Sequence, residues 1–308
     1  MWIKLAQMHF HPQAHAPLHA LMAKLTAAVD AGKIILPLSA NHFVETLKVE
    51  DIERRRKLAK VMVAFSKGWM LAPEHAVVPL QLHNALSRTF NFDDEYEIKF
   101  LDKGIHFAFG ITEDEYKNAG IHIQQRFRTF ARRSKEPEYL EMLLSNPCVP
   151  GSNRKSGITR FYELANSHTI NTEQQRESLE KYTKDDKHVS YVVAQTINFY
   201  PEINSTLLKN GKTFDDFLGL GKSKLMQFFA DVPTLEIERE LFIERNQDRQ
   251  RPIQDNDLID ISFFSIGIPY CDVTVSEKFF SSLAKRRHLD TKYTTTVLDN
   301  LESLEANL

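Results

Sequence analysis

Acidic residues gather in one short stretch near the C-terminal end of this 308-residue chain. Asp257 and Asp260 stand three residues apart in a segment with helical spacing, so their side chains should project from the same face. Asp272 and Glu277 lie at the two ends of an apolar VTV segment that is typical of a buried strand. Carboxylates crowded in this way raise one another's pKa unless a cation offsets their charge. Hard divalent ions such as Mg²⁺ or Mn²⁺ do so with a few carboxylates and retained water.

Glu45 is a further candidate from the other end of the chain. It lies one to two turns into the helix expected after an apolar strand at Lys33 to Leu38. In an open parallel sheet, reactive groups gather beyond the C-terminal ends of the strands. Glu277 stands at such an end, and Glu45 can approach the same edge. The alternative for any one of these acids is a helix cap or a solvated group.

The elements that would position these acids fall into two groups. The first group is a helix ending near Gly32, the strand at 33–38 and a long helix over 40–68. The second is a helix over 255–270, a strand at 271–276, a helix over 277–289 and a final strand at 292–298. Between them, about 73–246 has long helical patterns. Neither group has enough strands for a stable sheet by itself. We therefore expect 1–72 and 247–308 to form one α/β domain with a helical insertion at 73–246. The alternative is two small α/β pieces with a helical domain between them.

Two stretches resemble a known family. DLIDISFFSIGIPYCDVTVSEK, with PLSANHFVET upstream, is similar to the PIN-like superfamily of metal-dependent nucleases. The resemblance implies a three-layer α/β/α fold with a central, mostly parallel sheet, and an acidic pocket for Mg²⁺ or Mn²⁺. It covers 1–72 and 247–308 and leaves the middle unmatched. Glu45 matches the early-helix Glu of that family, and Asp257 or Asp260 matches the later-helix Asp. Asp272 and Glu277 flank the strand that carries the last acid. The implied metal ligands are Glu45, Asp260, Asp272 and Glu277, with Asp257 as a further catalytic candidate.

The chain differs from the family pattern at two points. Glu277 stands where Asp is commoner, which adds one methylene to the side chain. The family's first-strand Asp has no counterpart, because only Met1 precedes Trp2. We expect either a start upstream of this Met or a protein with weakened metal binding and low activity.

Two basic stretches are candidate phosphate contacts. QQRFRTFARRSK contains Arg126, Arg128, Arg132 and Arg133 interleaved with two phenylalanines, as a groove that follows a nucleic-acid backbone would need. Its alternative is a solvated helix face over an apolar stripe. Lys285, Arg286 and Arg287 follow the acidic strand and form the second stretch.

The composition limits the function classes. Hydrophobic residues make up 42% of the chain and charged residues 26%, and the net charge is −2. The chain is therefore not a polycation, so any contact with phosphates must be local. Its two cysteines, Cys148 and Cys271, are not in a ligand-like spacing. No apolar stretch is long enough to cross a bilayer, and we expect a cytoplasmic protein that can form a homo-oligomer. The sequence thus predicts a metal-dependent nuclease acting on RNA or DNA. The alternative is a catalytically impaired PIN-like scaffold that binds nucleic acid or a partner protein through its helical insertion.

Overall fold

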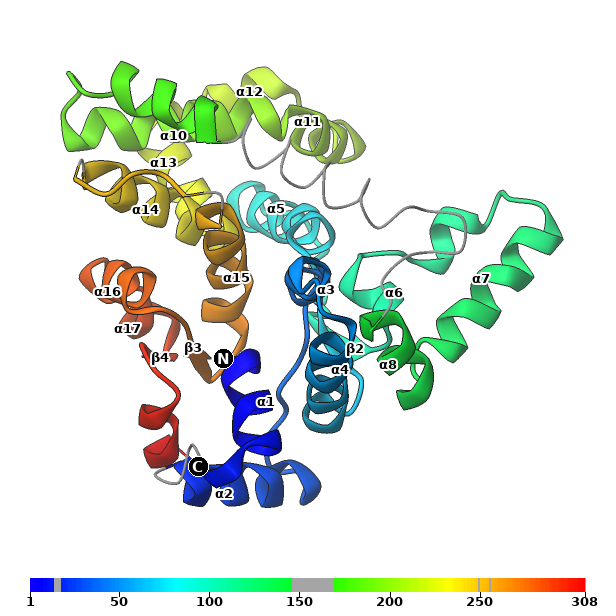
Figure 1. The fold of residues 1–308 in the computed structure, drawn as a ribbon. Helices are drawn as coiled ribbons and strands as arrows, with labels where there is room; N and C mark the ends of the chain where they lie inside the picture. Colours follow the sequence, from blue (N-terminus) through cyan, green and yellow to red (C-terminus); the bar gives the residue numbers. More distant parts are fainter. Residues whose placement is uncertain (14–17, 146–168, 249, 255, 308) are drawn as a thin grey trace.

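The computed structural model describes residues 1–13, 18–145, 169–248, 250–254 and 256–307. Cys148 and Asp255 lie outside these ranges. The described chain is mainly helical (Figure 1). Its N-terminal helices are α1 (Trp2–Phe10), α2 (His19–Asp30), α3 (Ala40–Lys48), α4 (Ile52–Ser66) and α5 (Glu74–Phe90). The middle of the chain forms α6 (Ile105–Ala108), α7 (Ile121–Arg133), α8 (Pro137–Ser145), α10 (Lys184–Asn198), α11 (Tyr200–Lys209), α12 (Phe214–Leu218), α13 (Gly221–Ala230) and α14 (Pro233–Gln247). The C-terminal helices are α15 (Asp257–Tyr270), α16 (Lys278–Arg286) and α17 (Leu289–Tyr293), and the 3₁₀ helices are η2 (Glu113–Tyr116) and η3 (Glu302–Asn307).

The prediction of a three-layer α/β/α fold with a central, mostly parallel sheet is wrong. The described strands form two separate pairs: β1 (Trp69–Leu71) is antiparallel to β2 (Leu101–Lys103), and β3 (Val273–Val275) is parallel to β4 (Thr296–Leu298). The strand expected at 33–38 contributes only a bridge from Leu38 to Met70. Pro37 lacks a backbone N–H, and Ile35 is exposed, so this apolar run packs as an extended segment instead of joining a ladder.

The C-terminal elements follow the prediction more closely. The expected helix, strand, helix and strand are α15, β3, α16 and β4. The long helix expected over 40–68 is divided in two, since residues 49–51 leave the helix and Asp51 caps α4 by accepting a hydrogen bond from the backbone N–H of Arg54. Ser39 begins α3 in a capping box with His42.

Four hydrophobic clusters hold the elements together. The first joins α1–α4 with α8 and η3, the second joins α14–α17 with β4, the third joins α5 with α10–α14, and the fourth joins β1, α5 and α15. Figure 1 shows α14, α15 and α5 at the centre, with α10–α13 above and α16, α17, β3 and β4 on one side. Segments from the expected insertion therefore pack into the same clusters as both chain ends. The boundaries at 72/73 and 246/247 stay a prediction. No helix in the described part of the chain is long and apolar enough to cross a bilayer.

A candidate acidic site

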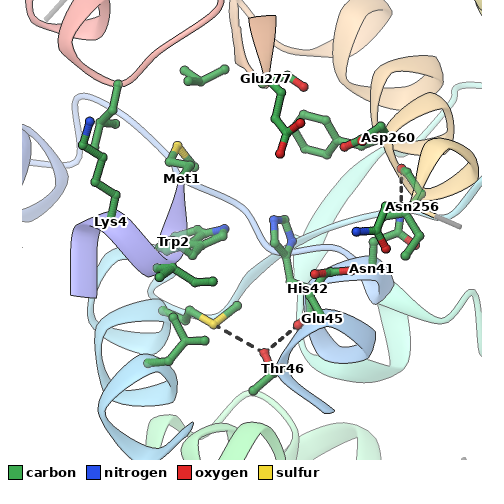
Figure 2. Close-up of a pocket in the computed structure, with 18 of the residues that line it drawn as sticks. Met1, Trp2, Lys4, Asn41, His42, Glu45, Thr46, Asn256, Asp260 and Glu277 are labelled. Atoms are coloured by element: carbon green, nitrogen blue, oxygen red, sulfur yellow. Dashed lines mark hydrogen bonds between the residues drawn. The ribbon is translucent and has the colours of Figure 1, made fainter. Parts of the chain in front are cut away.

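A cavity of about 500 Å³ lies where α1, α3, α15 and the ends of β3 and β4 meet (Figure 2). Three of the predicted acids, Glu45, Asp260 and Glu277, line it. Glu45 comes from α3 near the N-terminus, whereas Asp260 and Glu277 come from neighbouring elements near the C-terminus. The structure thus brings together three of the five predicted acids, although the sheet expected to carry them is absent.

The parallel pairing of β3 and β4 creates the acidic edge of the cavity. Val275 pairs with Leu298, so the residues that follow each strand leave the sheet side by side. On β3 these are Ser276 and Glu277, and on β4 they are Asp299 and Asn300, all of which line the cavity. Asp299 was missed in the sequence, yet the signal was present, because it directly follows the expected last strand.

Glu277 occupies the N-cap position of α16 but makes no side-chain capping bond there. Its carboxylate instead points into the cavity toward Asp260 (Figure 2). The capping alternative therefore does not account for this acid.

Among the predicted acids, Asp260 is the one whose surroundings most disfavour its charge. Burial, followed by the negative charges of Glu277, Asp257 and Glu45, raises its pKa to about 7. Its carboxylate has no hydrogen-bond partner among the described residues. The ionised form of a carboxyl group in this position is unfavourable unless a cation lies beside it to offset the charge.

Glu45 lies at the rim of the cavity on α3. Lys48 donates to Glu45 Oε1 at 2.7 Å and also to Asn256 Oδ1 at 2.7 Å. These bonds join α3 to the residue that precedes α15, which fixes the distance between the two helices. Asn41 adds a weaker link, from its Nδ2 to the carbonyl of Ile259 at 3.5 Å.

Asp257 lies behind the cavity and does not line it. Arg251 donates two hydrogen bonds to its carboxylate, at 2.8 and 2.7 Å, and the backbone N–H of Gln254 donates a third at 3.1 Å. The Arg251 guanidinium also stacks on Phe279, 3.9 Å from the ring centroid. Asp257 therefore anchors the start of α15 to the loop before it and to α16. The hydrogen bonds from Arg251 distinguish Asp257 from Asp260. The sequence could not separate the two acids, because both lie on the same face of the helix.

Asp272 is also outside the cavity. It is exposed at the beginning of β3, the end opposite to Glu277, and its backbone carbonyl accepts from Thr296 N. The strand thus separates the two acids that flank it.

None of the predicted phosphate contacts lines the cavity. Arg126, Arg128, Arg132 and Arg133 are exposed on α7, while Phe127 of the same helix is buried against Tyr116 and is not free to stack on a base. Arg128 pairs with Glu113. On α16, Lys285 is exposed, whereas Arg286 and Arg287 pair with glutamates of α14. Lys4, which does line the cavity, pairs with Glu302.

Neutral nitrogen donors complete the lining. Trp2 and His42 lie side by side with their ring centroids 5.8 Å apart, and burial lowers the pKa of His42 to about 3. His42 is therefore a neutral imidazole. Neither residue was among the predicted site residues.

The cavity contains the kinds of ligand atom that a hard cation binds, but the positions of these atoms in the described residues do not form a complete coordination site. Its carboxylate and amide oxygens are the atoms that Mg²⁺ and Mn²⁺ prefer. As the side chains stand, however, no three or more His, Cys, Asp or Glu side chains of the described residues are arranged to hold a metal ion. Fewer protein ligands, completed by water, would satisfy Mg²⁺ in its usual manner. The residues therefore fit an ion held through part of its hydration shell.

Comparison with known proteins gives no relative: no protein-family model matches the chain, and no curated protein or solved structure is significantly similar to it. Any functional conclusion must therefore come from the cavity itself.

Proposed function

We propose that this protein is a divalent-cation-dependent nuclease, which hydrolyses phosphodiester bonds of RNA or DNA at the cavity between α1, α3 and α15. Asp260 and Glu277 would hold Mg²⁺ or Mn²⁺, with Glu45 and Asp299 at its edge. The PIN-like resemblance contributes only the spacing of these acids, because the sheet of that family is not present.

The observation that carries the proposal is the convergence of carboxylates, of which Asp260 has no hydrogen-bond partner among the described residues. Four acids from α3, α15 and the ends of two parallel strands line one cavity, and Asp260 has a pKa raised to about 7. Folding brings these charges together at a cost in free energy. A bound cation removes that cost, whereas Glu236, Glu240 and Asp257 are paired with basic groups of the chain instead.

A divalent cation bound there would neutralise the anionic phosphate and lower the pKa of a water molecule, which is the chemistry that phosphodiester hydrolysis needs. The chain's own part is to hold the carboxylates at fixed positions. Lys48 sets the spacing of α3 and α15, and Arg251 anchors the start of α15 against α16. Leu58, Met62 and Phe263 supply apolar walls of the cavity.

The test is a cleavage assay with single- and double-stranded RNA and DNA in Mn²⁺ and in Mg²⁺. Wild type should cleave at least one substrate, and chelation should stop cleavage. Asp260→Asn and Glu277→Gln should each reduce the rate by about a hundredfold or more, as expected when charged groups acting on the reacting centre are lost. Asp272→Asn is the matched control, since Asp272 is an exposed acid of the same strand outside the cavity, and should cleave like wild type. No cleavage by wild type, or equal cleavage by Asp260→Asn, would refute the nuclease.

A second candidate function, binding of a partner protein, is favoured by an apolar groove of about 680 Å³ on α10–α13. Val193, Ile197 and Leu218 line it with about half or more of their surface exposed. Lys222 is the one charged residue in its lining, and no carboxylate of the described residues pairs with it. The groove therefore suits an amphipathic helix with an apolar face and an acidic residue placed to meet Lys222.

Two synthetic helical peptides with the same apolar face test this candidate, one with Glu and the other with Lys at the flanking position. The Glu peptide should bind more tightly to wild type, and Val193→Lys should abolish its binding. Equal affinity of the two peptides, or no binding by either, would dismiss the groove as a docking site.

A further inference from the structure

The indole N–H of Trp2 is a buried hydrogen-bond donor without an acceptor. Trp2 is only 6% exposed and lines the acidic cavity, and its Nε1 has no hydrogen-bond partner. Figure 2 shows this nitrogen on the side of the ring that faces His42. A buried donor left unpaired costs free energy, so an acceptor at this position would be bound favourably.

His42 offers a second donor at the same place. The backbone N–H of Ser39 donates to His42 Nδ1 at 2.8 Å, so Nδ1 must be the acceptor nitrogen and Nε2 must carry the proton. This bond belongs to the capping box that begins α3, and the fold therefore fixes both the tautomer and the ring. Nε2 has no partner among the described residues, and the ring points into the cavity toward Glu277.

The contact between the two rings does not use up these donors. Their planes are at 89° with centroids 5.8 Å apart, an edge-to-face arrangement. An N–H pointing at a ring face is a second-order interaction compared with a bond to an oxygen anion. Lys4, the lysine in the cavity lining, is already paired with Glu302. Burial lowers the pKa of the Met1 amino group, the other basic group of the described lining, while Glu277 and Asp260 act to raise it. Trp2 and His42 offer neutral donors beside it.

We propose that Trp2 Nε1–H and His42 Nε2–H together hold a non-bridging oxygen of the substrate phosphate, beside the carboxylates that hold the cation. This inference rests on the proposed nuclease function and adds the substrate contact to it. Because both donors are neutral, they bind one phosphate oxygen without competing with the cation for the acids.

Trp2→Phe tests the contact, because it keeps a ring in the cavity wall and removes only the donor. His42→Asn is the second variant: its Oδ1 can still accept from the Ser39 N–H, while nothing replaces Nε2–H. Trp69→Phe is the control, since Trp69 lies on β1 away from the cavity. The probe is a short oligonucleotide of the kind that wild type cleaves, bound in Ca²⁺ to suppress turnover. Mn²⁺ affinity is measured separately by calorimetry.

Trp2→Phe and His42→Asn should each weaken oligonucleotide binding by about tenfold, the effect of one hydrogen bond to a charged acceptor. Their Mn²⁺ affinity should stay that of wild type, and Trp69→Phe should change neither quantity. Trp2→Phe should also unfold at the same urea concentration as wild type or higher, which a purely structural tryptophan would not. If wild type cleaves and both variants bind oligonucleotide as wild type does, the donor pair is refuted while the nuclease stands. If wild type neither binds Mn²⁺ nor cleaves, both proposals are refuted.

Discussion

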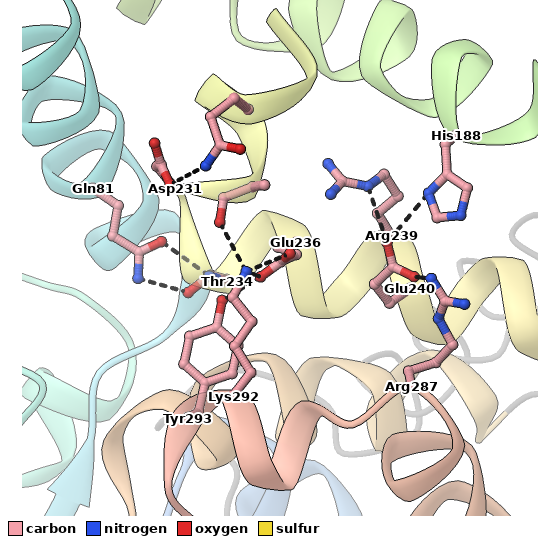
Figure 3. Close-up of polar contacts among 12 residues, drawn as sticks. Gln81, His188, Asp231, Thr234, Glu236, Arg239, Glu240, Arg287, Lys292 and Tyr293 are labelled. Carbon is pink, nitrogen blue, oxygen red and sulfur yellow. Dashed lines mark hydrogen bonds and ion pairs between the residues drawn. The ribbon is translucent and has the colours of Figure 1, made fainter. Parts of the chain in front are cut away.

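Glu240 on α14 and Asp260 in the cavity are carboxylates that the fold surrounds in opposite ways. On α14, Glu240 contacts His188 at 3.2 Å and also pairs with Arg239 and Arg287 (Figure 3). Burial acts to raise the pKa of Glu240, but the hydrogen bond from His188 and the neighbouring positive charges outweigh it and hold that pKa below its ordinary value. In the cavity, Asp260 has no such partner, and burial and like charges raise its pKa to about 7.

Glu236, one turn earlier on α14, is also a buried carboxylate with a basic partner. Lys292 donates to its Oε1 at 2.7 Å, and the Tyr293 hydroxyl donates to Oε2 at 2.5 Å. These bonds tie α14 to α17, as those of Glu240 tie it to α10 and α16. The contrast separates Glu236 and Glu240, which join helices through basic partners, from Asp260, which has no hydrogen-bonded basic partner and lines a cavity. Glu238, also on α14, departs from the pattern, because burial and Glu74 raise its pKa to about 8. Asp260 is the candidate for binding a ligand, because it combines a raised pKa with a place in the cavity lining.

The largest effect on stability should come from breaking an α14 pair. Glu240→Ala leaves the buried guanidinium of Arg239 without its carboxylate, so unfolding free energy should fall by about 3 to 5 kcal/mol. Urea denaturation at neutral pH measures it. Glu113→Ala, which breaks the exposed pair with Arg128, should cost less than about 1 kcal/mol. Equal losses of unfolding free energy in the two variants would show that the ion pairs of Glu240 stabilise the fold no more than an exposed pair does.

Asp257 should behave like Glu240 in spite of its position three residues before Asp260. Asp257→Asn weakens the two hydrogen bonds from Arg251, and we expect a loss of about 2 kcal/mol in unfolding free energy. Its Mn²⁺ affinity should remain near that of wild type. Loss of Mn²⁺ binding without loss of stability would instead make Asp257 a ligand.

Asp260→Asn should raise the unfolding free energy, in contrast to the substitutions above. Because the folded-state pKa of Asp260 is raised from 3.8 to about 7, the folded state binds more protons than the unfolded state between these values. Wild type therefore loses stability from this group as pH rises through that window, and the variant does not. Without divalent ions, Asp260→Asn should be more stable than wild type by about 1 to 2 kcal/mol above pH 7. The difference should disappear near pH 4. Equal stability of the two proteins across the range would remove the contrast between Asp260 and Glu240.

The smallest effect is expected on α7. Arg126 and Arg132 are exposed, make no ion pair with any described residue and do not line the cavity. Replacing both with Ala should change kcat/KM for oligonucleotide cleavage by less than about threefold at physiological salt, since exposed charges at a distance are screened. A larger drop, with a shallower dependence of affinity on salt, would restore α7 to the substrate interface.

The sequence predicted which acids gather better than it predicted the architecture. Glu45 and Glu277 could be found because each follows an expected strand or helix start, and α15, β3, α16 and β4 have clear periodic signals. The strand at 33–38 failed because an apolar run with Pro37 can pack against a hydrophobic cluster without forming a ladder.

The roles of the individual site residues could not be predicted, because they depend on contacts between elements and not on spacing along the chain. Asp257 and Asp260 share a helical face, and only the position of Arg251 separates their roles. Asp272 and Glu277 flank the same strand, yet only the second lies at the edge shared with β4. Trp2 and His42 gave no signal by themselves, since their donors matter only where α1 and α3 meet.

Calorimetric titration of Mn²⁺ into metal-free wild type, Asp260→Asn and Asp272→Asn tests the central claim most directly. We predict that wild type binds Mn²⁺ and that its affinity rises as pH increases through 7, because the ion displaces the proton of Asp260. Asp272→Asn should bind as wild type does, and Asp260→Asn should lose binding. Wild type that binds no Mn²⁺, or an Asp260→Asn variant that binds it equally well, would contradict the account.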